Sequence, residues 1–257
     1  MLDYGLDMSG VRRDLALPAL VAEGDELEAL VAAQSDWTLP TPAAGWTIAH
    51  QIAHLAAADA NVLIAIRTPA AFEDVLKKVA AEGDRSADLD AAAGAAEPRS
   101  ELLERWRTGR AEVAVALADI PLRQGFPWFG SELTATLMVP LRLMETWAHG
   151  QDIFETLGVR HPATDRLEYV AALGVAGLGL SFYAAQLPTP AEPFRVELKA
   201  PHGHTWAWGP EDATQRIYGS ALDFCLRVTH RASRAETDLT AVGPDADKWL
   251  DIARVFL

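Results

Sequence analysis

The sequence predicts a mainly α-helical protein, with a four-helix bundle over residues 1–188 and a small α+β domain over residues 189–257. Apolar residues recur at helical spacing along most of residues 17–186, and a Pro-Thr-Pro sequence then interrupts the pattern. Residues 194–199 alternate between apolar and polar with a period of two. A period near 3.6 is typical of amphipathic helices, whereas a period of two indicates a half-buried strand.

Proline and glycine divide the first part into segments. The expected helices span residues 18–33, 47–67, 72–81, 98–119, 132–157 and 165–186. Thr47 is a suitable N-cap for the second helix, and Pro69 ends that helix. Gly158 is a suitable residue for the position just after the end of the fifth helix. The stretch 82–97, rich in alanine and glycine, is expected to be a loop, and residues 121–130 a connection.

The C-terminal part is expected to contain short strands and two helices. A hairpin should join strands at residues 194–199 and 205–208, with helices at 220–229 and 245–256 and an extended segment at 238–242. A module of this size has a small core of its own. We therefore expect it to dock on the bundle.

Charge and cysteine content argue against several classes of protein. The chain has 22 Lys and Arg against 36 Asp and Glu, a net charge of −14, whereas nucleic acids and anionic membranes attract basic surfaces. Its single cysteine, Cys225, allows no internal disulfide and no cysteine-ligated zinc site. The first ten residues lack Lys and Arg, unlike a secretory leader, and no apolar run reaches membrane-spanning length. We expect a cytoplasmic protein without nucleic-acid or membrane partners.

Acidic and histidine residues share one face of the fifth predicted helix. Glu145 and His149 are four residues apart, and Asp152 follows three residues later among apolar neighbours. Buried carboxylates and imidazoles are costly unless they are paired or bind a metal. One histidine of the second helix, His50 or His54, would complete a three-ligand site.

Two histidines and a carboxylate suit Zn²⁺ or another borderline divalent ion, with a coordination position left for water or substrate. An open position is typical of a catalytic zinc site, and Asp152 could orient a ligand or join the shell. The alternative interpretation is a solvated helix face, with the histidines of the second helix serving as a helix cap or as core hydrogen-bond partners.

A family resemblance favours the metal site. Gly45-Trp46-Thr47, then His54, then Glu145-Thr146-Trp147-Ala148-His149-Gly150-Gln151-Asp152 resembles the pattern of DinB-like metal-binding bundles, and more specifically that of mycothiol-dependent maleylpyruvate isomerases. The resemblance implies metal ligands at His54, Glu145 and His149, with His50 as a neighbour. It also implies a sterol-carrier-like domain after the bundle.

The resemblance further implies an activity. In this family a divalent metal, here expected to be zinc, activates the small thiol mycothiol for S-transfer or isomerisation of an electrophilic substrate. The competing hypothesis is a non-catalytic, metal-stabilised module that binds an apolar ligand or a protein partner. A homodimer is compatible with either hypothesis but has no sequence signature.

The resemblance also implies a catalytic arginine in the C-terminal part. In the family, an arginine there helps hold the substrate or the thiol cofactor, and Arg231 is the best match. His230 stands where the family has glycine. The alternative is that Arg227 and Arg231, four residues apart, are surface residues near a helix C-terminus.

Three further residues have alternative interpretations. Cys225 lies between Phe224 and Leu226 in a predicted helix, and we expect a buried apolar side chain rather than a nucleophile. Trp128 and Phe129 are expected to anchor the bundle, with the lining of a ligand pocket as the alternative.

Overall fold

The computed structural model describes residues 13–255, which divide into two compact units at residues 161 and 162. We had expected the boundary at residue 188. It lies earlier because α7 (Leu167–Ala176) packs against α9 (Ala221–Val228), and α8 (Leu178–Ala184) packs against α10 (Pro244–Ile252). The helices expected to close the bundle therefore belong to the second unit.

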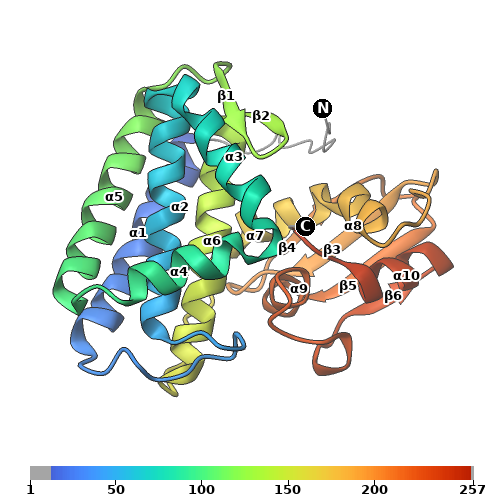
Figure 1. Ribbon diagram of the computed structural model, residues 1–257. Helices are drawn as coiled ribbons and strands as arrows, with labels where there is room; N and C mark the ends of the chain where they lie inside the picture. Colours follow the sequence, from blue (N-terminus) through green and yellow to red (C-terminus); the bar gives the residue numbers. More distant parts are fainter. Residues whose placement is uncertain (1–12, 256–257) are drawn as a thin grey trace. The chain divides into compact units, whose positions relative to one another are not determined.

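The first unit is the expected four-helix bundle. Its long helices are α1 (Arg13–Ala33), α2 (Ile48–Arg67), α5 (Arg99–Asp119) and α6 (Ala135–Thr156), which run side by side (Figure 1). Apolar side chains from these helices fill the core that the sequence pattern predicted. Among those fully or almost fully buried are Leu27, Val31, Ile48, Ile52, Leu55, Leu102 and Trp106.

The expected loop at residues 82–97 is wrong, because most of it is helical. After α3 (Phe72–Glu82), helix α4 (Ser86–Ala95) crosses α2 at close range. A Cβ atom added to Gly94 would lie only 2.8 Å from the Cβ of Ala53. The small residues that suggested a loop are therefore what allows two helices to pack closely.

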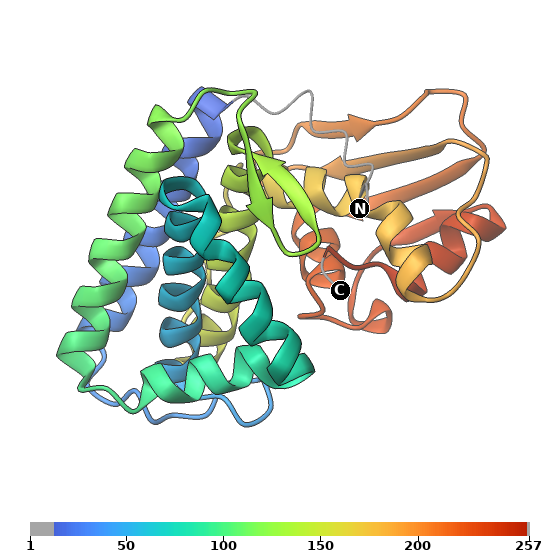
Figure 2. The same ribbon diagram turned by 45° about the horizontal axis from the view of Figure 1, so that its top comes forward.

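A β-hairpin occupies the connection before α6. Strands β1 (Gly125–Trp128) and β2 (Ser131–Thr134) pair antiparallel across a two-residue turn, and Gly130 takes a φ of +79° there (Figure 2). Helix α6 consequently begins at Ala135 rather than at residue 132. At the turn, Trp128 and Phe129 contact the buried ring of Phe72, so they do anchor the bundle.

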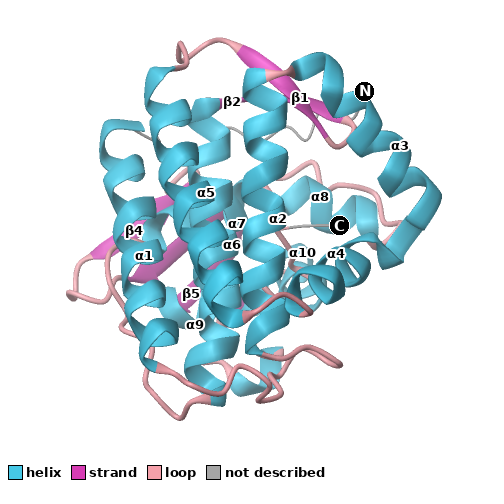
Figure 3. Ribbon diagram, turned by 60° about the vertical axis from the view of Figure 1, so that its left-hand side comes forward, coloured by secondary structure: helices cyan, strands magenta, loops and turns pink. Residues whose placement is uncertain are grey.

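The second unit contains a four-stranded mixed sheet. The predicted hairpin of β3 (Phe194–Lys199) and β4 (Thr205–Trp208) is confirmed, with Val196 opposite Trp208. Two further strands, β5 (Gln215–Ser220), parallel to β3, and β6 (Thr240–Val242), complete the order β4-β3-β5-β6. Figure 3 draws the strands in magenta and labels β4 and β5 of this sheet. Of these two, the sequence pattern missed β5.

The helices of the second unit partly follow the predicted pattern. Helices α9 and α10 are confirmed and pack against the sheet, but the single helix expected over residues 165–186 is broken at Gly177. There α7 and α8 meet at a bend of 54°. Among the described residues, no single helix is long and apolar enough to cross a membrane; α7 and α8 would reach that length and composition only as a bent pair.

Candidate metal centre

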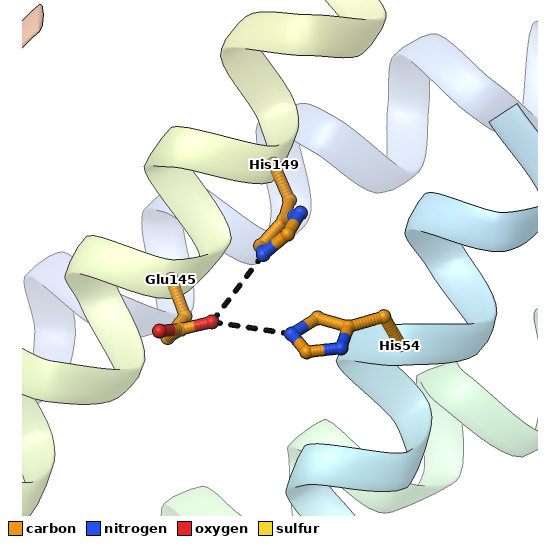
Figure 4. A group of neighbouring side chains, drawn as sticks. All are labelled: His54, Glu145 and His149. Carbon is orange, nitrogen blue, oxygen red and sulfur yellow. Dashed lines mark hydrogen bonds and ion pairs between the residues drawn. The ribbon is translucent and has the colours of Figure 1, made fainter. Parts of the chain in front are cut away.

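Three predicted ligands converge between α2 and α6. Oε2 of Glu145 lies 3.3 Å from Nε2 of His54 and 3.4 Å from Nε2 of His149 (Figure 4). The ligand atoms of all three residues lie within 4.8 Å of one another. Two ligands of a tetrahedral zinc ion, each about 2.1 Å from the metal, are about 3.4 Å apart. The spacing therefore fits one ion between the three side chains.

The carboxyl group of Glu145 is held in its charged form. Burial raises its pKa, but hydrogen bonds from His149 and His54 and their charges outweigh burial, and the net pKa is well below the usual range. The side chain of Glu145 keeps 27% exposure, while those of His54 and His149 keep 21% and 15%. The cluster is therefore shielded but accessible from one side, as an open metal site requires.

A glutamine that the sequence reasoning missed orients one ligand. Oε1 of Gln51 lies 2.5 Å from Nδ1 of His149, and Nε2 of Gln51 donates to Oδ2 of Asp152 at 3.2 Å and to Oγ1 of Thr41 at 2.9 Å. Because an amide oxygen only accepts, His149 carries a proton on Nδ1, and Nε2, which faces Glu145, is the nitrogen left for a metal. Asp152 thus acts on the ligand indirectly, through Gln51.

The carboxylate of Glu145 requires a positive charge between itself and Nε2 of His149. Nε2 of His149 faces a carboxylate oxygen of Glu145, and the attraction between them needs a positive charge on that side of the ring. Either a proton or a divalent metal ion can supply that charge. Two imidazoles and one carboxylate are ligands that borderline ions such as Zn²⁺ accept, so the residues fit the metal that the sequence predicted.

His50 lies one turn earlier on α2 and caps the start of that helix. Its Nδ1 atom lies 2.8 Å from Oγ1 of Thr47 and 3.3 Å from the backbone nitrogen of the same residue, which completes a reciprocal cap at the start of α2. The cluster of possible ligands contains His54 instead. Trp46 covers the ligands on this side, stacked on His149 with ring centroids 5.9 Å apart.

A cavity of about 390 Å³ opens beside the ligands within the first unit. His54 and Glu145 form part of its wall, opposite side chains from α3, α4 and the β1–β2 turn. Trp128 and Phe129 line it as well as anchoring the bundle. Arg142, one turn before Glu145 on α6, completes the inner wall.

Arg231 lies in the second unit, directly after α9. The helix ends in a Schellman motif, in which the backbone nitrogen of Arg231 donates to Leu226 and that of His230 donates to Arg227. His230 takes a left-handed φ of +60°, the conformation for which glycine is preferred. The catalytic role of Arg231 stays a prediction.

Two of the buried residues of α9 are Arg227 and Cys225. Arg227, expected at the surface, is only 8% exposed and donates to the backbone oxygens of Leu250 and Asp251. Its role in this unit is therefore structural. Cys225 is fully buried, as predicted, and burial raises the pKa of its thiol well above the usual range.

Comparisons with known proteins match this chain to two families, to relatives and to solved structures. Residues 20–154 match the family described as the mycothiol maleylpyruvate isomerase N-terminal domain, and residues 190–242 match the family described as wyosine base formation. Uncharacterized proteins from two strains of Mycobacterium tuberculosis are each 46% identical over 239 residues, which covers 92% of this chain and 93% of theirs.

Two solved structures share the fold. The crystal structure of the mycothiol-dependent maleylpyruvate isomerase matches with a TM-score of 0.64 at 14% identity, over 96% of this chain and 98% of the other. The structure of a histidine-to-alanine mutant of that isomerase matches with a TM-score of 0.63 over the same shares. Since the N-terminal domain match covers more than half of the sequence, this chain belongs to the mycothiol maleylpyruvate isomerase N-terminal domain family.

Proposed function

We propose that this protein is a metal-dependent enzyme in which the metal activates a small thiol for S-transfer to a substrate or for isomerisation of a substrate. Support comes from the name of a structural relative, the mycothiol-dependent maleylpyruvate isomerase. The observation that carries the proposal is the set of His54, Glu145 and His149 at metal-binding spacing beside a cavity. A purely structural zinc site is normally closed by a fourth protein ligand. Here the wall beyond the three ligands is open to a small molecule.

The chain's own residues prepare the site. Gln51 accepts a hydrogen bond from Nδ1 of His149, and Trp46 stacks on the same ring. Bound zinc would lower the pKa of a thiol and hold the thiolate next to an electrophile in the cavity. Trp128 and Phe129 offer apolar surface against which the carbon skeleton of such a substrate can pack.

The sulfur would have to come from outside the chain. Cys225 is the single cysteine, and its burial keeps the thiol protonated near neutral pH. A protein thiol is therefore a poor candidate for the nucleophile. We propose mycothiol as the thiol, and an electrophilic small molecule as the second substrate.

Metal content and thiol turnover together test this function. Wild type and His54→Ala would be purified without a tag, analysed for zinc, and assayed for consumption of electrophiles with mycothiol, with glutathione and with no thiol. We expect about one zinc per chain and thiol-dependent turnover in the wild type, with both lost in the variant. Wild-type protein without metal, or turnover that His54→Ala leaves unchanged, would refute the proposal.

The competing hypothesis, a non-catalytic binding module, makes a different prediction. In that case the metal stabilises the bundle, and a sterol-carrier-like C-terminal domain binds an apolar ligand or a protein partner. It predicts that zinc raises the melting temperature while no thiol is consumed. The cavity beside the ligands favours the enzyme, because a stabilising metal has no need of an adjacent pocket.

A further inference from the structure

A second cavity, of about 310 Å³, lies within the first unit between α1 and α5. Its walls are mostly apolar and include Leu20 and Val21 of α1 and Trp106 and Val113 of α5. A cavity of about 150 Å³ is enough to hold benzene, so this one has room for a small substituted ring. It shares no lining residue with the cavity beside the metal ligands, and the proposed chemistry does not use it.

The inner end of this cavity contains a buried carboxylate with one free oxygen. Asp59 of α2 lines the cavity, and its side chain is only 6% exposed. Both of its contacts with Arg142, from Nε at 3.1 Å and from Nη2 at 3.0 Å, go to Oδ1. Oδ2 retains accessible surface and accepts no hydrogen bond from the part of the chain that the structure describes. Because a buried carboxylate oxygen without a donor is costly, the cavity contains an acceptor that a ligand can satisfy.

The pKa of Asp59 agrees with this shortage of donors. Burial raises the pKa above its ordinary value, although the charge of Arg142 and its hydrogen bond act in the opposite direction. A further donor at Oδ2 would stabilise the charged form of the carboxylate.

A second polar group at the inner end is also an acceptor. Thr146 of α6 lines the cavity and donates its hydroxyl proton to the backbone oxygen of Arg142 at 2.9 Å. Since a hydroxyl group has one proton, Oγ1 of Thr146 can only accept a further hydrogen bond. A molecule that reaches this end of the cavity must therefore bring the donor itself.

The polar groups at the mouth of the cavity satisfy one another. Arg110 of α5 reaches across to α1, where Nη1 lies 2.8 Å from Oδ1 of Asp25 and Nη2 pairs with Glu28. A Cβ atom on Gly24 would lie 3.0 Å from that Nη1, so the glycine in the middle of α1 makes room for the arginine. The unpaired Nε of Arg110 is enclosed and offers no donor to the cavity.

The charges around the cavity favour a neutral ligand. Asp59 and Arg142 form a buried pair with no net charge, so a cationic ligand would add a buried charge that nothing compensates. An anionic ligand would be repelled by Oδ2 of Asp59. A neutral O–H or N–H group can donate to this oxygen without either cost.

We propose that the cavity between α1 and α5 binds a small neutral molecule that is apolar except for one hydrogen-bond-donating group, and that this group donates to Oδ2 of Asp59. A phenol is the simplest molecule of this kind. Water alone fits less well, because one water molecule fills about 30 Å³ and leaves the apolar walls uncovered. The inference does not depend on the proposed function, since the two cavities have different linings.

Fluorine NMR titrations with 4-fluorophenol and 4-fluorotoluene test the inference. The two probes have nearly the same shape, and only the phenol has a donor. They would be added to wild type, Asp59→Asn, His54→Ala and Ala114→Phe, the last of which fills the cavity from α5. Ala118→Phe is the matched control, because Ala118 is exposed on the same helix and does not line the cavity.

We expect the wild type to bind 4-fluorophenol several-fold more tightly than 4-fluorotoluene, because only the phenol donates to the carboxylate. Ala118→Phe and His54→Ala should bind the phenol as wild type does, and Ala114→Phe should weaken both probes by at least about 10-fold. Asp59→Asn should weaken the phenol about 10-fold and leave 4-fluorotoluene unchanged, since its amide keeps the oxygen toward Arg142 and turns its N–H groups to the cavity.

Several outcomes would overturn the inference. These are a wild type that does not bind 4-fluorophenol or binds both probes equally, and a folded Ala114→Phe that binds the phenol as wild type does. Loss of phenol binding in His54→Ala would place the probe at the metal instead. If circular dichroism shows that Asp59→Asn or Ala114→Phe is unfolded, the two probes on wild type and on Ala111→Phe decide, since Ala111 is an exposed residue of the cavity lining.

Discussion

Gln51 and His149 are joined by a contact of 2.5 Å between the Oε1 and Nδ1 atoms, which links helix α2 to helix α6. Gln51 lies three residues before His54, so one face of α2 supplies one metal ligand and orients another. The position of one helix therefore sets the geometry of both histidines. This contact also determines which nitrogen of His149 is available to a metal.

We expect Gln51→Leu to weaken zinc binding by about 10-fold to 100-fold, because His149 loses the acceptor that fixes its tautomer and its ring orientation. Affinity would be measured by competition with a chromogenic chelator. Gln124→Leu, at an exposed glutamine before β1, is the control and should bind zinc as wild type does. Unchanged affinity in Gln51→Leu would show that the contact does not orient the ligand.

Replacing each of the two histidines of α2 should have a different effect, one on zinc binding and the other on stability. His54→Ala should abolish tight zinc binding, since only one histidine and Glu145 would remain. His50→Ala should bind zinc but lose about 1 kcal/mol of stability, because it removes half of the reciprocal cap with Thr47. Zinc titration and urea unfolding of the metal-free proteins distinguish the two effects. Loss of zinc from His50→Ala would mean that the ligands are wrongly assigned.

The left-handed conformation of His230 predicts an unusual order of stability among its variants. His230→Gly and His230→Ala both lose the contact between the ring and the backbone oxygen of Ala253. They differ in that alanine keeps the steric cost of a positive φ. We expect the glycine variant to be more stable than the alanine variant by about 1 kcal/mol in urea unfolding. Equal stability would contradict the conformation of this helix end.

A partly buried ion cluster between α1 and α5 should make stability depend on pH. Burial raises the pKa of Glu28, but hydrogen bonds and charges of Arg110 and Arg107 outweigh it, so the pKa is lowered on folding. Its carboxylate thus adds stability that is fully present above the unfolded value near 4.5 and is lost as pH falls through the folded pKa.

The Glu28→Gln variant tests this direction of the change in stability with pH. Near neutral pH the variant should be less stable than wild type by about 1–2 kcal/mol, since it loses charge-assisted hydrogen bonds. The difference between the two proteins should shrink in acid, where the wild-type carboxylate is protonated. Urea unfolding of both proteins across the acidic range measures the difference at each pH. A constant difference would show that the charge of Glu28 does not contribute.

Local patterns in the sequence were sufficient for the bundle and for two of the three candidate ligands, Glu145 and His149. The apolar spacing of α2 and its Thr47 cap depend on residues within a few positions of each other, as does the spacing of Glu145 and His149 on α6. The choice of His54 over His50 came from the family pattern rather than from spacing. The structure assigns His50 to the helix cap and His54 to the cluster.

Elements whose stability depends on distant neighbours were missed. Helix α4 has an Ala- and Gly-rich sequence that suggests a loop, yet Gly94 allows close packing on Ala53 of α2. Strands β1 and β2, with the sequences Gly-Phe-Pro-Trp and Ser-Glu-Leu-Thr, do not alternate between apolar and polar residues, so no period of two marks them. The break at Gly177 lies within an unbroken apolar run, so the sequence showed no polar signal for it.

The sequence by itself determined which residues could bind a metal, because helical spacing places Glu145 and His149 on one face whatever else the chain does. Only the tertiary structure decided that Gln51 orients His149 and that Arg142 meets Asp59 in the cavity wall. Asp59 and Arg142 are 83 residues apart, and Gln51 and His149 are 98 apart. Contacts over such separations depend on how helices pack, which no local pattern specifies.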